Sequence, residues 1–363
     1  MFSKKSAVVL EKYHPNREQI LSLLMAHRQP NIAVVGDYCL DKYLYIDPAL
    51  DEPSVETGLT ARQVRRTACY PGVGGTVTAN LIALGAKVQC VGVRGNDGEG
   101  CDLASALTKL GANTDLLLVG DDLLTNTYIK PMEMLDEGNR ELNRIDIRQP
   151  KRIPNAIFAE LETKLASIIE TVDAVIICDQ FTNEPGSVVT DRFRKFLGRL
   201  GKRYPAIFFL GDSRSYPDRY QNILVKCNAN EIISCYERYK RGEQPKNVDA
   251  DVATIFKDDE LLSAGKWLSE RNDRPVLVTR GEKGSLLFQG DQATIIPPIR
   301  VRGQIDICGA GDATNAAFAF GRVIGLDLAS AAWLANVVSS ITIRQIGVTG
   351  TASMRQIRRV LHR

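Results

Sequence analysis

Short apolar runs recur along the chain, and helical patterns separate most of them. These runs cover residues 31–37, 88–91, 174–178, 206–210, 223–225 and 275–278. Continuous apolar strands of this kind are buried on both faces, which is typical of parallel sheets covered by helices. The pattern therefore predicts an α/β fold with a mostly parallel central sheet.

Two other regions have a different texture, in which apolar and polar positions alternate. They extend over about residues 38–70 and 120–148. Alternation predicts half-exposed strands, so we expect a small separate β-sheet there, suited to a lid or to a homodimer contact. Residues 1–30 predict a polar lead-in and an amphipathic helix, an N-terminal extension that leaves 31–363 as the main domain. The charged stretch 236–259 predicts a surface excursion.

The charge balance is nearly even, which narrows the range of partners. The 46 lysines and arginines and 43 acidic residues give a formal net charge of +3, too little to favour nucleic acid or a membrane surface. No apolar run approaches the roughly 20 residues that cross a bilayer, and no leader pattern is found, so we expect a cytoplasmic protein. The eight cysteines lack a CxxC pair and the three histidines lack partners at ligand spacing. This argues against disulfides and against a transition-metal site.

The most informative segment is Asp306-Ile-Cys-Gly-Ala-Gly-Asp312, which leads directly into an apolar helical pattern. The backbone amides of Gly309, Ala310 and Gly311 can approach an anion closely, and a helix N-terminus adds about half a positive charge. Asp312 follows in the first turn, where its carboxylate can accept the proton of a hydroxyl nucleophile. We therefore predict a phosphate-handling site with Asp312 as catalytic base. A tight turn that Asp312 merely caps is equally compatible with this segment alone.

Three further motifs accompany this segment. Val91–Gly100 reads V-G-V-R-G-N-D-G-E-G, Asn228–Glu231 reads N-A-N-E, and Thr279–Gly284 reads T-R-G-E-K-G. Together with G-A-G-D they resemble the signatures of the ribokinase-like (phosphofructokinase B) carbohydrate kinase family. The resemblance implies a three-layer sandwich with a small β lid, and transfer of a phosphoryl group from ATP to a sugar hydroxyl.

The same resemblance implies residues for the nucleotide and its metal. The expected ATP-binding residues are Asn228, Thr279, Gly281, Gly284 and Asn336. Glu231 is expected to hold Mg²⁺ through water, which suits an ion that keeps much of its hydration shell. Each motif also has a simpler interpretation. Asn228 with Glu231 fits a helix capping box, the glycine turn fits a β-hairpin, and the Asn336 amide fits a hydrogen bond to a neighbouring loop.

The acceptor site is expected to come from residues nearer the N-terminus. The residues implied are Asp37, Asp41, Gly72, Gly74, Gly75 and Thr76. Asp37 and Asp41 follow the end of an apolar strand, where α/β sheets bind their ligands. Thr76 stands where the family usually carries an asparagine.

Asp306, together with the loop 344–351, is implied as a site for a monovalent cation such as K⁺.

Within the family, the closest resemblance is to kinases of heptose 7-phosphate, carried by Gly36–Asp41, Asn143–Asp146 and Thr279–Arg280. Two other functions stay open: a nucleoside or vitamin kinase on the same scaffold, and a non-catalytic nucleotide- or sugar-binding regulator. A dehydrogenase is disfavoured because the first strand lacks a G-x-G-x-x-G turn.

Overall fold

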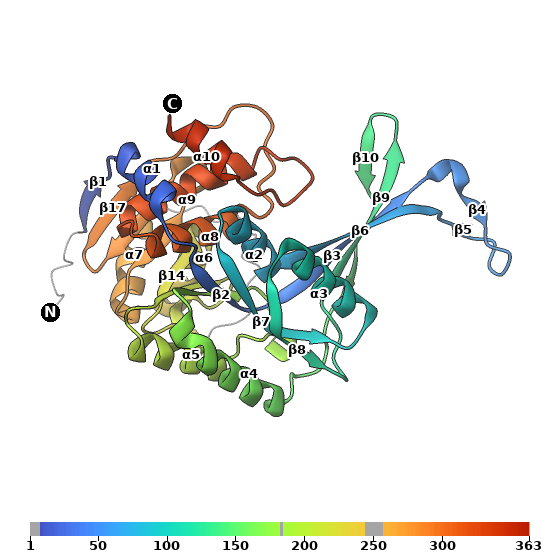
Figure 1. The fold of residues 1–363 in the computed structure, drawn as a ribbon, viewed down its shortest axis with the longest axis horizontal. Coiled ribbons are helices and arrows are strands. Elements are labelled where there is room, and N and C mark those ends of the chain that lie inside the picture. Colours follow the sequence, from blue (N-terminus) through green and yellow to red (C-terminus); the bar gives the residue numbers. More distant parts are fainter. Residues whose placement is uncertain (1–7, 182–183, 244–256, 363) are drawn as a thin grey trace.

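A large twisted sheet forms the centre of the molecule (Figure 1). The computed structural model describes residues 8–181, 184–243 and 257–362. Ten strands within these residues form the central sheet; from edge to edge they are β1 (Val9–Lys12), β17 (Gln292–Ile296), β16 (Ser285–Gln289), β15 (Val276–Thr279), β14 (Leu224–Asn228), β13 (Phe208–Ser213), β12 (Ala174–Asp179), β2 (Asn31–Gly36), β7 (Lys87–Gly95) and β8 (Asn113–Gly120). Of these, β16 alone runs against the others. The predicted mostly parallel sheet is confirmed.

Helices cover both faces of this sheet. One layer holds α1 (Arg17–Ala26), α2 (Gly74–Ala83), α3 (Gly98–Leu110), α8 (Ala310–Val323), α9 (Leu328–Thr342) and α10 (Met354–Leu361). The other holds α4 (Asn155–Ile168), α5 (Asp191–Arg203), α6 (Ala229–Lys240) and α7 (Asp258–Asn272). Short 3-10 turns occur at Pro48–Leu50, Ile169–Thr171, Glu184–Gly186, Pro217–Arg219 and Gly281–Lys283.

Two separate apolar clusters fill the space between the sheet and its helices. Along β2, Ile32 and Val34 belong to the first cluster and Ala33 and Val35 to the second. Successive side chains of a strand point to opposite faces, so a continuous apolar strand serves both clusters at once. The result is the three-layer sandwich that the sequence predicted.

A second, smaller sheet projects from the body on the side away from β1 and α10 (Figure 1). Its strands are β10 (Gly138–Glu141), β9 (Thr127–Leu135), β3 (Tyr38–Ile46) and β6 (Val64–Val73), with β11 (Ile145–Ile147) paired to β9. The strands β4 (Glu52–Pro53) and β5 (Thr60–Ala61) form a separate pair beyond it. The small separate sheet is confirmed; its service as a lid stays a prediction.

Some segments differ from what the apolar pattern predicted. The N-terminal helix is present as α1, but strand β1 precedes it and pairs with β17. The charged stretch 236–259 starts inside α6 and ends in α7, and its central part lies outside the described residues. No helix in the described ranges is long and apolar enough to cross a membrane.

Candidate active site

The predicted anion turn lies at the start of α8. Gly309 is the residue before the helix and has a φ of 74°, in the left-handed region that glycine adopts without strain. Its lack of a side chain is also needed, because a Cβ there would lie 3.3 Å from the Cγ2 of Thr76 and 3.2 Å from that of Thr349. The Ala310 amide already donates to the carbonyl of Ile307 at 3.1 Å. An anion could therefore recruit the Ala310 amide only by breaking that turn.

Asp312 occupies the first turn of α8, as predicted. Burial raises the pKa of its carboxyl group, and the Asp212 and Asp41 carboxylates add to the rise, while Lys226 and Arg214 oppose it; the resulting pKa is about 7. Its side chain is only partly buried. A partly buried carboxyl group with a pKa near neutrality is suited to proton transfer.

A buried ion pair that the sequence analysis missed lies beside Asp312. The Lys226 ammonium on β14 contacts Oδ2 of Asp212 at the end of β13 at 3.1 Å. Asn315, one turn after Asp312 on α8, also donates to this oxygen. Burial lowers the pKa of Lys226, but the charges of Asp212, Glu231 and Asp312 and the hydrogen bond to Asp212 together outweigh it, so the net shift is upward. One signal was visible: a lysine inside an otherwise apolar strand pattern.

The acceptor residues predicted near the N-terminus lie close to the anion turn. Thr76 lies next to Gly309, as the distances above show. A Cβ on Gly72 would lie 2.9 Å from Oδ2 of Asp41 and 2.6 Å from Sγ of Cys39. Asp41 also pairs with Lys130 of β9 at 3.0 Å. The structure thus brings Gly72, Asp41 and Thr76 to the same region as Asp312.

Asp37 is placed differently from the other acceptor candidates. Its carboxylate is buried and accepts backbone N–H groups of Gln180, Phe181 and Val188, each at 2.9 Å. Burial and the nearby Asp179 charge raise its pKa to about 7, although these bonds oppose the rise. The bonds favour a structural role in holding the backbone at Gln180, Phe181 and Val188, and contact of Asp37 with a sugar stays a prediction.

Gly74 and Gly75 are buried at the start of α2. A Cβ on Gly74 would lie 2.9 Å from the carbonyl oxygen of Asp37, and one on Gly75 would lie 2.3 Å from Cβ of Pro71. Both glycines therefore allow the helix to start close against the preceding chain. That packing role accounts for them without a ligand.

Several predicted nucleotide residues line one pocket of about 310 Å³ at the ends of β14 and β15. The predicted residues in its lining are Asn228, Thr279 and Gly281. Arg280 and Lys283 also line the pocket. Arg280 was not among the predicted ATP-binding residues; burial lowers its pKa, and its Nε has no partner among the described residues. Two cationic side chains suit a nucleotide phosphate.

The simpler interpretations of the ATP motifs are also present in the structure. Asn228 and Glu231 form a complete capping box at the start of α6. The glycine turn 281–284 joins the antiparallel strands β15 and β16 as a hairpin. Asn336 accepts from Ser285 and donates to the Pro297 carbonyl. Gly284 and Asn336 are not among the described residues that line the pocket.

The described residues show how a metal could be held. In the ranges that the structure covers, no three histidine, cysteine, aspartate or glutamate side chains gather at metal-binding distance. Magnesium would therefore rely on water and nucleotide phosphates, its usual mode in kinases. Glu231 fits a contact through water, because Oε2 accepts the Asn228 amide while no described residue bonds Oε1. Burial raises the Glu231 pKa to about 7.

Asp306 connects the anion turn to a neighbouring loop. Its two carboxylate oxygens accept the backbone N–H groups of Cys308, at 3.0 Å, and Gly347, at 2.9 Å. Asp306 thus lies against the predicted loop 344–351 and orders the turn. Its binding of a monovalent cation stays a prediction.

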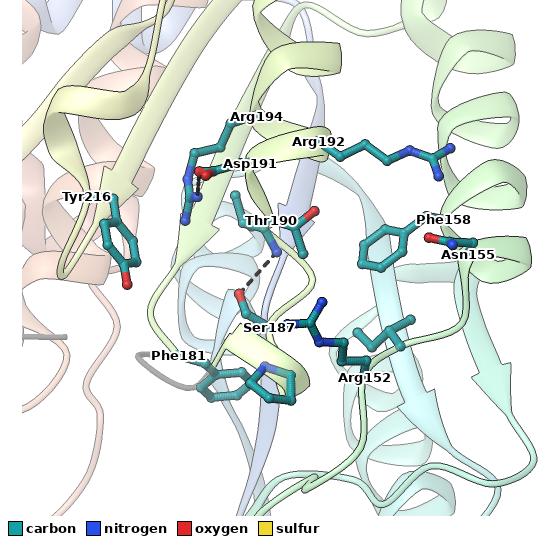
Figure 2. Close-up of a pocket in the computed structure, with 13 residues that line it drawn as sticks. Arg152, Asn155, Phe158, Phe181, Ser187, Thr190, Asp191, Arg192, Arg194 and Tyr216 are labelled. Carbon is teal, nitrogen blue, oxygen red and sulfur yellow. Dashed lines mark hydrogen bonds and ion pairs between the residues drawn. The ribbon is translucent and has the colours of Figure 1, made fainter. Parts of the chain in front are cut away.

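Figure 2 shows another pocket, of about 280 Å³, beside the first residues of α5. Phe158, Phe181, Thr190, Arg194 and Tyr216 are among its lining residues. Of the described residues around it, none was predicted as a site residue. Arg194 points toward Asp191 there, at 2.8 Å. The candidate active site therefore lies elsewhere, around Asp312.

Comparisons with known proteins agree with this geometry. Residues 224–354 match the pfkB family carbohydrate kinase model. The chain is 28% identical over 345 residues to the bifunctional protein HldE of Geotalea uraniireducens, covering 94% of this chain and 65% of that protein. It is 26% identical over 341 residues to HldE of Helicobacter hepaticus, covering 92% and 64%. The chain thus spans just under two thirds of the length of these curated relatives.

Solved structures share the fold at low sequence identity. Arabidopsis thaliana ribokinase complexed with ribose and ATP superposes with a TM-score of 0.63 at 19% identity, covering 92% of this chain and 99% of that one. Escherichia coli phosphofructokinase-2 in complex with fructose-6-phosphate gives 0.66 at 15% identity, with the same coverage. The architecture is therefore that of the ribokinase-like proteins. More particularly, residues 224–354 carry the match to the pfkB family carbohydrate kinase model, the family that the sequence resembles.

Proposed function

We propose that the chain transfers the γ-phosphoryl group of ATP to a hydroxyl group of a sugar phosphate resembling heptose 7-phosphate. The observation that carries the proposal is the Asp312 carboxyl group, which has a pKa of about 7 and lies in the first turn of α8 beside the anion turn. Asp41 and Thr76 lie on the acceptor side of this turn, and the pocket that Asn228 and Thr279 line lies at the ends of β14 and β15.

Every bond and proton of the proposed transfer can be accounted for with the two substrates and residues of this chain. The acceptor oxygen forms a bond to the γ-phosphorus, while the bond from this phosphorus to the β–γ bridging oxygen breaks and ADP leaves with the electron pair. The proton of the attacking hydroxyl passes to the Asp312 carboxylate, and the amides of Gly311 and Asp312 in the first turn of α8 stabilise charge on the phosphoryl group. Magnesium bound with the nucleotide would supply further charge neutralisation.

A phosphorylated acceptor is supported by a small pocket next to the site. It measures about 70 Å³ and is lined by Arg148, Arg214, Tyr128 and Gln180, among others. Arg214 is also close enough to lower the pKa of Asp312. Guanidinium groups bind phosphate with two parallel hydrogen bonds, so this pocket suits the phosphate of an acceptor. The HldE relatives agree with such a substrate.

The test is ADP release from Mg·ATP across heptose 7-phosphate, fructose 6-phosphate, ribose and a nucleoside. We expect turnover with a sugar phosphate, and a loss of about 10² to 10⁴ in kcat for Asp312→Asn, the usual contribution of a general base. ATP binding, measured by calorimetry, should persist in the variant. Activity within tenfold of the wild type would contradict the role of Asp312.

The same panel separates the alternatives. Turnover with the nucleoside alone would favour a nucleoside kinase. ATP binding without turnover on any acceptor would favour a non-catalytic regulator.

A further inference from the structure

The Lys226 ammonium lies directly beneath the anion turn. A Cβ placed on Gly311 would be 3.1 Å from Lys226 Nζ, so the ammonium lies close to the backbone at Gly311. Its side chain is 5% exposed. A charge at this depth is expensive to bury and is normally fully paired.

The pairing of Lys226 is incomplete. An ammonium carries three N–H donors, and in the part of the chain that the structure describes, its single hydrogen-bond acceptor is Oδ2 of Asp212. Asp212 does not depend on Lys226 alone, because Asn315 donates to the same oxygen. Two donors of a buried cation are thus left next to the place where an anion is expected.

We propose that Lys226 is a catalytic residue that donates hydrogen bonds to the phosphoryl group during its transfer. This inference rests on the proposed function and assigns a residue to that same site. Lys226 stays protonated throughout, because the proton of the acceptor goes to Asp312. As the bond to ADP breaks, the ammonium stabilises the negative charge on the phosphoryl oxygens from the side of the sheet, opposite the amides of α8.

The competing explanation is that Lys226 only neutralises Asp212. In that case a charge at position 226 matters only while position 212 is charged. The two explanations can be separated by comparing single and double variants.

The experiment uses four variants of the full chain: Lys226→Met, Lys226→Arg, Asp212→Asn and the double variant Lys226→Met/Asp212→Asn. Calorimetry gives the affinities for ATP and ADP without any acceptor. We expect Lys226→Met to weaken ATP binding about 10- to 100-fold, the range for a hydrogen bond to a charged group, with a much smaller effect on ADP. Lys226→Arg should retain part of the preference for ATP.

The double variant decides between the explanations. If Lys226 contacts the phosphoryl group, adding Lys226→Met to Asp212→Asn lowers the preference for ATP over ADP. The factor is then similar to the one by which Lys226→Met lowers it in the wild type. Equal ATP preference in the double variant and in Asp212→Asn would overturn the proposal. The double variant buries no unpaired charge, so it decides the question even if Lys226→Met does not fold.

This readout also separates the two proposals. Loss of the ATP preference in the Lys226 variants, combined with no turnover on any acceptor, would support Lys226 as a phosphate contact and reject the kinase assignment. Normal turnover, combined with an equal ATP preference in the double variant and in Asp212→Asn, would support the kinase assignment and reject Lys226 as a phosphate contact.

Discussion

Strands β12 and β13 lie side by side, and each presents an aspartate near its end to a buried cation. On β12, Asp179 pairs with Arg194, at 2.7 Å; on β13, Asp212 pairs with Lys226, at 3.1 Å. The two pairs are almost equally buried. They differ in how far the hydrogen-bonding capacity of the cation is used.

In the arginine pair, every nitrogen of the guanidinium has an acceptor. Nε and Nη2 of Arg194 donate to Asp179, and Nη1 donates to Asp191. The hydroxyl of Tyr220 donates to the same Asp179 oxygen at 2.9 Å, and the guanidinium packs over the Tyr216 ring at 4.9 Å. The rigid fork of arginine suits such fixed pairing.

The lysine pair is left open by contrast. Lys226 uses one donor on Asp212 within the described residues, and its ammonium faces the turn at Gly311. A compact ammonium can reorient toward an incoming anion. The comparison teaches that burial and ion pairing alone do not distinguish the two cations; what distinguishes Lys226 is its unused donors beside the predicted anion turn.

The largest effect is expected for Arg194→Met, which tests whether the Arg194–Asp179 pair serves stability. Removing one partner leaves the buried Asp179 charge uncompensated, so we expect a loss of about 3 to 5 kcal/mol in the free energy of unfolding. Urea unfolding of the full chain measures it, with Arg194→Lys as the control that keeps the charge but not the fork. The preference for ATP over ADP should be unchanged in Arg194→Met. If Arg194→Met were as stable as the wild type but had an altered preference for ATP over ADP, a structural role for Arg194 would be wrong.

A smaller effect is expected for Tyr220→Phe, which removes one hydrogen bond to the Asp179 carboxylate. A bond to a charged group contributes about 1.5 to 3 kcal/mol, and the same urea titration would measure its loss. Tyr38→Phe is a matched control, because the buried Tyr38 hydroxyl donates at 2.8 Å to a neutral acceptor, the Val34 carbonyl. If both variants lost equal stability, the charge of Asp179 would not be the reason.

The smallest expected effect concerns pH and Asp312. Its pKa is raised from 3.8 to about 7 in the folded chain, so the folded state holds a proton that the unfolded state releases. The contribution of Asp312 to stability is therefore favourable at low pH and falls as pH rises from about 4 to about 7. Above pH 7, Asp312→Asn should be more stable than the wild type by about 0.5 to 2 kcal/mol, the usual gain when a strained functional group is removed.

Activity should show the opposite pH trend. The base must be ionised, so kcat/KM is expected to rise with pH and to level off above about pH 7. Thermal melts at pH 5 and pH 8 and a pH–rate profile measure the two trends. If the stability of the wild type and that of Asp312→Asn depended on pH in the same way, the raised pKa of Asp312 would be contradicted.

The sequence predicted the elements whose pattern is local. The strands β2 and β12 are continuous apolar runs, and the turn before α8 is marked by its glycines, so both could be recognised without tertiary information. Asp312 was predicted from that same turn, whereas Asp41, Gly72 and Thr76 were assigned through the family resemblance; the structure brings the four together.

What the sequence could not predict depends on contacts between distant segments. The partners of Asp37 lie in the 180–188 segment, so its buried, fully bonded state was invisible at the strand end. Lys226 belongs to an apolar strand, but only the positions of β13 and α8 place it beneath Gly311. Strand β1 was missed because four exposed residues form a strand only when the edge of β17 is available.

The proximity of Thr76 to Gly309 has a further consequence, for how the protein becomes active. The acceptor side of the site comes from the first quarter of the sequence and the anion turn from its last part, so neither is complete without the other. Contacts between such distant positions form late in folding, because the loop between them must first be ordered. A nascent chain that has not yet placed α8 would therefore lack the complete candidate site, which forms only after the whole sandwich has closed.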